Sequence, residues 1–194
     1  DVTHPRGHTD PWAVMLDANG DLQWQKSLGG SGEERVYGDV KQLPDGNFVL
    51  TTLTWSADVD ISEFFGGYMD GWIVKISATD GTIIWDRTLG TIEMENTASL
   101  SNTGANHFDI LPDGNLIVMY NTSPWQYNDY GTKVEHVLLG KVDATTGELI
   151  YTNTYGTNLP SGASGFTASS RGYSLFAKEN GAILVFGITN SVHG

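Results

Sequence analysis

The chain has 194 residues, of which 39% are hydrophobic and 17% charged, so it carries enough apolar material for a folded core. Its formal charge of −13 excludes nucleic acid and anionic membranes as partners, because no basic cluster is present to neutralise phosphates. With no cysteine and no run of about 18 apolar residues, disulfides, thiol chemistry and membrane insertion are not expected either.

The predicted elements are short strands. Asn-Gly, Asp-Gly and similar turns typical of β-hairpins separate them. Twenty-four glycines and many Thr, Ser, Asn and Asp residues favour such strands over helices. In chain order, the first four strands are predicted at Trp12–Leu16, Leu22–Leu28, Val36–Leu43 and Asn47–Thr54.

Two landmarks occur three times along the chain and define an internal repeat. The first is a strand that leads to a turn glycine, and its copies begin at Trp12, Trp72 and Leu138. The second is a turn, with the copies Pro44-Asp45-Gly46, Pro112-Asp113-Gly114 and Glu179-Asn180-Gly181. The glycines of the first landmark, Gly20, Gly81 and Gly147, are 61 and 66 residues apart. The copies are therefore similar in length.

The first and fourth strands of each copy are apolar on both faces. In the first strand Trp12 and Val14 lie on one face, while Ala13 and Met15 lie on the other. A small sheet with two apolar faces has to be packed between neighbours. We predict an all-β fold of β-propeller blades, as three four-stranded antiparallel repeats of about 60–67 residues within a larger propeller. A stacked solenoid is the alternative.

The blades are expected at residues 10–55, 70–122 and 136–190 of a single propeller segment that spans 1–194. If the two ends were joined, residues 189–194 and 1–12 would form a linker similar to the one between the first two blades. We therefore expect either that the segment belongs to a longer array or that its ends meet a neighbouring copy, with head-to-tail self-association as one outcome.

The three best-matching segments, Asp10–Gly30, Asp70–Thr91 and Lys141–Thr157, resemble secreted bacterial β-propeller repeats. Blades of that family read approximately D-x-W-x-V-K-L-D-x-x-G-x-x-x-W. The turn before Tyr151 is also similar to the D-x-x-T-G-x-x-x-W turn of quinoprotein-like propellers. The resemblance implies a bacterial extracellular or cell-surface location, and it implies that Trp24 and Trp85 dock neighbouring blades, with Tyr151 as a departure.

A calcium site is the first candidate for chemistry. Oxygen ligands that alternate along a loop suit a hard cation such as Ca²⁺. The candidate ligands are Asp58, Asp60, Ser62 and Asp70. The alternative is an acidic turn that hydrogen-bonds its own backbone, because the glycine and final Glu of an EF-hand loop are missing.

Histidines near the termini are the second candidate. His4, His8 and Asp10 are close in sequence, and His193 would join them if the ends meet. Imidazole clusters suit zinc or nickel. The competing interpretation is a terminus whose histidines are simply exposed.

Loop aromatics are the third candidate, as a ligand-binding surface. Flat aromatic rings on loops stack against sugar rings or anchor a protein partner. The predicted contact residues are Trp55, Phe64, Phe65 and Tyr68 in the first linker and Trp125, Tyr127 and Tyr130 in the second. The same rings could instead cover apolar blade edges.

No catalytic arrangement stands out in the sequence. The serines have no G-x-S-x-G elbow. Carboxylates such as Glu33 and Glu93 could pair for glycoside chemistry, but the sequence does not give the distance between them. We therefore expect a non-catalytic extracellular module for adhesion, assembly, or glycan or protein binding. The alternatives are a fragment of a propeller enzyme, either a quinone-dependent dehydrogenase or a glycan-processing enzyme, and a structural subunit of a filament or surface layer.

Overall fold

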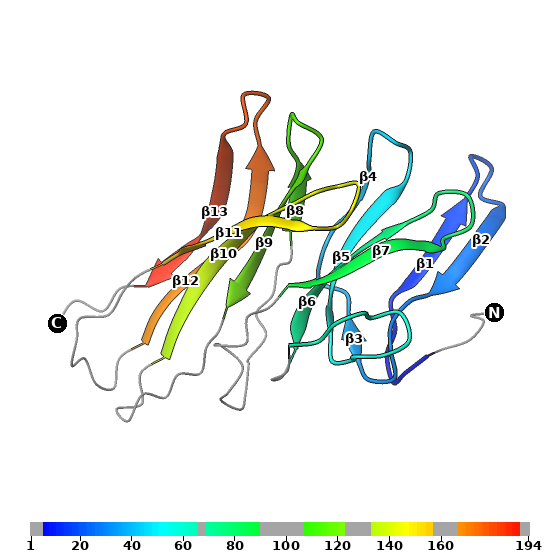
Figure 1. The fold of residues 1–194 in the computed structure, drawn as a ribbon, viewed down its shortest axis with the longest axis horizontal. Helices are drawn as coiled ribbons and strands as arrows, with labels where there is room; N and C mark the ends of the chain where they lie inside the picture. The colour runs from blue at the N-terminus through cyan, green and yellow to red at the C-terminus, as the bar shows by residue number, and fades with distance from the viewer. Residues whose placement is uncertain (1–5, 66–68, 90–106, 123–132, 157–166, 191–194) are drawn as a thin grey trace. The chain divides into compact units, whose positions relative to one another are not determined.

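The computed structural model of the chain describes residues 6–65, 69–89, 107–122, 133–156 and 167–190. All regular structure within these ranges is β-strand, which confirms the predicted all-β class (Figure 1). No helix in the described ranges is long and apolar enough to cross a membrane. Contacts divide the chain into two compact units, one made of Asp1–Phe65 and Asp70–Gly90 and the other of Gly66–Met69 and Thr91–Gly194.

The first unit contains a hairpin and a larger sheet. The hairpin strands are β1 (Trp12–Leu16) and β2 (Leu22–Ser27). The sheet strands are β3 (Glu34–Arg35), β4 (Val40–Gln42), β5 (Phe48–Thr54), β6 (Asp70–Ile76) and β7 (Ile83–Leu89). Strands β4 to β7 pair antiparallel in chain order, and β3 pairs with the far end of β5.

The second unit contains one six-stranded sheet. Its strands are β8 (His107–Ile110), β9 (Leu116–Thr122), β10 (Lys133–Val142), β11 (Leu149–Tyr155), β12 (Thr167–Ala177) and β13 (Ile183–Asn190). Strands β8 to β11 form an antiparallel meander, and β12 and β13 form a hairpin. The start of β12 pairs in parallel with the start of β10.

The four-stranded sheets are offset by half a copy from the predicted blades. Strand β5 pairs with β6, and β9 pairs with β10, although the predicted boundaries separate the members of each pair. Strand β2 shares no sheet with β3 or β4. The difference arises because long connections both precede and follow every hairpin, so sequence periodicity does not show which neighbouring hairpin completes a sheet. The propeller architecture stays a prediction.

The strand registers bear out the internal repeat. The last pairs of the three equivalent hairpins are Leu16↔Leu22, Ile76↔Ile83 and Val142↔Leu149, and a bulge precedes each of them. The other three hairpins close on Gln42↔Phe48, Ile110↔Leu116 and Ala177↔Ile183. Residues that the sequence repeat aligns, such as Trp12 with Trp72, therefore occupy equivalent backbone positions.

The turns of these last three hairpins are also identical in hydrogen bonding. In the first, the Gly46 amide donates to the Leu43 carbonyl, and the Leu43 amide donates to the Asn47 carbonyl. Gly46 has a φ of 86°, in the left-handed region that glycine adopts without steric cost. The turns at Gly114 and Gly181 repeat both bonds and the positive φ.

Each unit has its own apolar cluster. In the first unit Trp72, Val74 and Ile76 of β6 are buried, and Ala13 and Trp24 of the β1–β2 hairpin pack against them. In the second unit the buried residues come from β9, β10 and β12, and the β13 residues that pack against them are Ile183 and Val185. In each unit a two-stranded hairpin thus covers one face of four antiparallel strands, and in the second unit the hairpin also joins their sheet through β10 and β12.

Candidate functional site: the glycine loop and its carboxylates

A loop of four residues after β2, Gly29–Gly32, points four consecutive backbone amides at four different side chains. Consecutive amides of this kind form a concavity that binds anions. Here the protein's own side chains accept the bonds: Asp60 from Gly29 (3.2 Å), Glu34 from Gly30 (3.1 Å), Asp58 from Ser31 (2.7 Å) and Ser56 from Gly32 (2.9 Å). The site is therefore closed by internal acceptors.

Close backbone approach explains the glycines of this loop. A Cβ atom on Gly30 would lie 2.2 Å from the Cβ of Ser56 and 2.6 Å from a carboxylate oxygen of Asp58. On Gly7, which lies against the loop, a Cβ would lie 2.2 Å from the Gly32 carbonyl oxygen. A side chain on Gly30 would force the loop away from the segment after β5, and a side chain on Gly7 would force it away from the segment before β1.

Glu34 is the buried centre of the site, with none of its surface exposed. One carboxylate oxygen accepts from the hydroxyls of Thr54 (2.9 Å) and Ser56 (2.7 Å), and the other accepts from the Gly30 amide. A buried carboxylate is tolerated when hydrogen bonds replace its lost hydration. Glu34 therefore joins β3, the end of β5 and the glycine loop.

An arginine from the N-terminal segment completes the polar network. Arg6 forms an ion pair of 3.0 Å with Asp60 and donates to the Ser27 carbonyl at 3.2 Å. Asp10 accepts from the backbone amides of Arg6 (2.6 Å) and Gly7 (3.1 Å). These contacts fix the segment before β1 to the end of β2 and to Asp60.

The predicted calcium ligands Asp58 and Asp60 are both engaged with the glycine loop. The hydrogen bonds from Ser31 lower the pKa of Asp58 below its usual range. Asp60 accepts from Gly29 and pairs with Arg6. Both carboxylates accept bonds from backbone amides, but these amides belong to a distant loop and not to the acidic turn itself, as the alternative interpretation expected.

The other two predicted ligands, Ser62 and Asp70, form hydrogen bonds with Asp86 and with Phe65. The Ser62 amide (2.9 Å) and hydroxyl (3.0 Å) both donate to Asp86, which also accepts from the Trp72 indole at 3.1 Å. Asp70 is buried and accepts from the Phe65 amide at 2.8 Å. No group of three or more His, Asp or Glu side chains suited to a metal lies in the described parts of the chain. Calcium binding stays a prediction.

The terminal histidine cluster falls mostly outside the described residues. His4 and His193 lie there. His8 is exposed, and its backbone amide donates to the Gly32 carbonyl at 2.9 Å. Asp10 belongs to the network around Arg6.

Of the seven predicted contact aromatics, the structure describes three. Trp55 is half-buried, and the Arg35 guanidinium lies 5.1 Å from the centre of its ring, in cation–π geometry. Phe64 and Phe65 are also half-buried. The four aromatics outside the described residues are Tyr68, Trp125, Tyr127 and Tyr130.

Sequence reasoning missed a buried ion pair in the second unit. Glu135 on β10 is 2% exposed and pairs with Arg171 on β12 through two short bonds, of 2.5 and 2.7 Å. The carboxylate raises the pKa of Arg171 further above its usual value. The only sequence signal was a glutamate at the start of a run of apolar residues, which does not identify its partner.

The tryptophan after the first turn, Trp24, contacts the larger sheet of the first unit. That it docks neighbouring propeller blades stays a prediction. The Trp24 indole donates to the Ala78 carbonyl at 2.9 Å, in the turn between β6 and β7. Its ring lies so close to Gly81 that a Cβ there would be 2.7 Å from it. Trp24 therefore fastens the β1–β2 hairpin onto the larger sheet.

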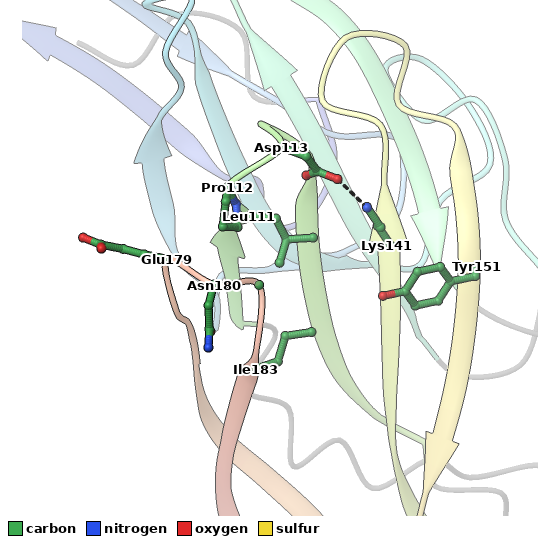
Figure 2. A pocket seen from close by; sticks show the side chains of 9 residues that line it. Leu111, Pro112, Asp113, Lys141, Tyr151, Glu179, Asn180 and Ile183 are labelled. Carbon is green, nitrogen blue, oxygen red and sulfur yellow. Dashed lines mark hydrogen bonds and ion pairs between the residues drawn. The ribbon is translucent and has the colours of Figure 1, made fainter.

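The equivalent residue of the second unit, Tyr151, lines a pocket instead. Figure 2 shows this pocket, of about 310 Å³, between Tyr151, the Asp113–Lys141 ion pair of 2.5 Å and the turn that carries Asn180. Ile183, the first residue of β13, forms part of its floor. Hydrogen bonding to Lys141 lowers the pKa of Asp113.

No protein-family model matches the sequence, and no curated protein matches it significantly. What this chain does has to be argued from its own geometry.

Proposed function

We propose that this chain is a non-catalytic repeat module of a bacterial extracellular or cell-surface protein, and that it binds a protein or glycan through aromatic side chains on the long connections that follow β5 and β9. The repeated strands supply a rigid scaffold, and the connections that differ between copies supply the contacts. Adhesion is the biological role that fits such a module.

One observation carries the proposal. The amides of the glycine loop donate to side chains of the same unit, and the contact between Arg35 and the Trp55 ring lies close to this network in sequence. The carboxylates Glu34, Asp58 and Asp60 all accept bonds from the loop, as a scaffold requires. Beside this network, Trp55 and Arg35 present a ring and a cation, the two side-chain types most enriched at binding hot spots.

Calorimetric titration with cello-, xylo- and chito-oligosaccharides tests the glycan form of this proposal. We expect binding to at least one of them, and we expect Trp55→Ala to weaken it while the chain stays folded. Tyr37→Ala is the control, because Tyr37 is an exposed aromatic that is not among the predicted contact residues. Absence of binding to every oligosaccharide would overturn the glycan form, and equal losses in the two variants would remove Trp55 from the contact surface.

A further inference from the structure

The hairpins β1–β2 and β12–β13 are complementary halves of one four-stranded sheet. In the described parts of the chain, a hairpin of the β4–β5 type is followed by a hairpin of the β6–β7 type, and the two pair through β5 and β6. The β8–β9 and β10–β11 hairpins repeat this arrangement. By register, β12–β13 is a first hairpin and β1–β2 is a second hairpin. Within the described residues, no strand pairs with the remaining edge of β1 or of β13.

Apolar side chains that such pairing would bury are exposed on both of these hairpins. Trp12 is 55% exposed, whereas its equivalent Trp72 is 1% exposed. Phe186 is 71% exposed, whereas its equivalent Met119 is fully buried. The position of Trp12 is apolar in all three copies, as Trp12, Trp72 and Leu138, and the last two are buried. The position of Phe186 holds Met119 and Thr51 in the other copies, and both of these are buried.

Neighbouring positions repeat the contrast. Val14 and Leu16 on β1 are exposed, while Val74 and Ile76 are buried against Ala13 and Trp24. Exposed apolar surface in a contiguous patch marks an association site.

The pocket at Tyr151 marks where the missing hairpin fits. In the first unit the β6–β7 turn fills the equivalent space, with Gly81 against Trp24 and the Ala78 amide bonded to Asn47 at 3.3 Å. In the second unit the equivalents of Trp24 and Asn47 are Tyr151 and Ala182. The turn that corresponds to Ala78–Gly81 is Ala18–Gly20, at the tip of the β1–β2 hairpin.

From these observations we propose that the free edge of β13 binds the β1–β2 hairpin of a second copy of this chain, so that copies assemble head to tail. The register follows from the two pairings inside the chain: Phe48 with Ile76 and Leu116 with Val142 place Ile183 opposite Leu16 of the second copy. Val185 then faces Val14, and Phe186 faces Ala13. The tip of the incoming hairpin occupies the pocket in Figure 2 and contacts Tyr151.

This contact is heterologous, because one copy contributes β13 and the other contributes β1. Repeated contacts of this kind form a ring if the rotation closes and a filament if it does not. A second copy supplies the shape, the register and the apolar surface that this contact requires.

Disulfide trapping tests the proposed register, since the chain has no cysteine of its own. The single variants Val14→Cys and Val185→Cys are mixed in a glutathione buffer and analysed on non-reducing gels and by peptide mass spectrometry. Facing residues of antiparallel strands lie within disulfide reach. We expect a disulfide between the two different variants. Met15→Cys mixed with Val185→Cys is the matched control, because the Met15 side chain points to the opposite face.

Light scattering of the unmodified chain is a second measurement, and it does not depend on a variant that could fail to fold. We expect its average mass to rise with concentration above 21.0 kDa. Phe186→Lys should lower the average mass to that of the monomer. Ile150→Lys is the control and should not lower it, because Ile84, the equivalent residue in the first unit, is exposed although its sheet is complete. A chain that is monomeric at every concentration, or a disulfide yield no higher with Val14→Cys than with Met15→Cys, would overturn the proposal. A disulfide that forms only inside one chain, in the double variant Val14→Cys/Val185→Cys, would overturn it as well.

Discussion

The two units bury a glutamate each, and they satisfy it in different ways. Glu34 accepts from two hydroxyls and one backbone amide, all neutral donors close to the glycine loop. Glu135 instead pairs with a guanidinium that reaches it from another strand. The two buried glutamates lie at different positions of the repeat, and the donors that each one meets differ in charge.

The position of the second glutamate explains this difference. Glu135 lies where β10 and β12 run in parallel, and Arg171 is its partner on β12. Asn121 of β9 adds two bonds to the backbone of Gly172, of 2.8 and 3.0 Å. The β12–β13 hairpin is therefore held to the meander by side chains as well as by its short parallel pairing.

The largest expected effect follows from breaking the ion pair. Arg171→Met removes the guanidinium that pairs with the buried Glu135 carboxylate, and we expect a loss of about 3–5 kcal/mol in the free energy of unfolding in urea. Adding Glu135→Gln should recover most of this loss, because the buried charge is then gone. Lys141→Met is the control: its partner Asp113 is about half exposed, and such pairs contribute up to about 1 kcal/mol. Equal losses for the two single variants would contradict the distinction between buried and exposed pairs.

Glu34→Gln is the matching change in the first unit, and we expect a smaller loss of about 1–3 kcal/mol. One oxygen is retained for the hydroxyls, but an amide NH₂ replaces the acceptor of the Gly30 amide. Urea unfolding measures the loss, with Glu33→Gln as the control because Glu33 is partly exposed. A stability unchanged by Glu34→Gln would show that the buried bonds to neutral donors contribute nothing.

Sequence patterns were sufficient for the β class, the hairpins and their turns. Alternating apolar residues and Asp-Gly signals are local, so they specify β4–β5 or β6–β7 without reference to the rest of the chain. Which hairpins join into a sheet depends on contacts between distant residues such as Leu50 and Val74, and periodicity carries no such information.

The candidate sites show the same limit. The acidic motif at Asp58 and Asp60 was found, but its partners, the amides of Gly29 and Ser31, are about 30 residues away in sequence and reach the motif only through folding. Glu135 and Arg171 are 36 residues apart and gave no joint signal.

Trp24 and Tyr151 offer a third comparison, between a docked ring and an undocked one. Trp24→Phe removes the bond to the Ala78 carbonyl, and we expect a loss of about 1 kcal/mol in thermal or urea unfolding. Tyr151→Phe should leave the stability of the monomer unchanged at low protein concentration, because 41% of Tyr151 is exposed beside the pocket. A larger loss for Tyr151→Phe than for Trp24→Phe would reverse the assignment.

The smallest expected effect is the contribution of Asp58 to the pH dependence of the free energy of unfolding. Because its pKa is lowered in the folded chain, its contribution to stability is present above the unfolded value of 3.8 and is lost as the pH falls through the lowered value. Asp58→Asn should therefore flatten the decrease in unfolding free energy below pH 4. Urea unfolding between pH 2 and 6 measures the slope, and an identical slope in both proteins would assign the acid sensitivity to other carboxylates.

The central structural claim is that each four-stranded sheet combines the second hairpin of one sequence copy with the first hairpin of the next. Nuclear Overhauser spectroscopy of the labelled chain tests it directly, because facing residues of antiparallel strands give strong backbone cross-peaks. The structure predicts cross-peaks between β5 and β6, in the register that places Leu50 opposite Val74 and Thr51 opposite Ile73. Cross-peaks between β2 and β4 in their place would contradict it.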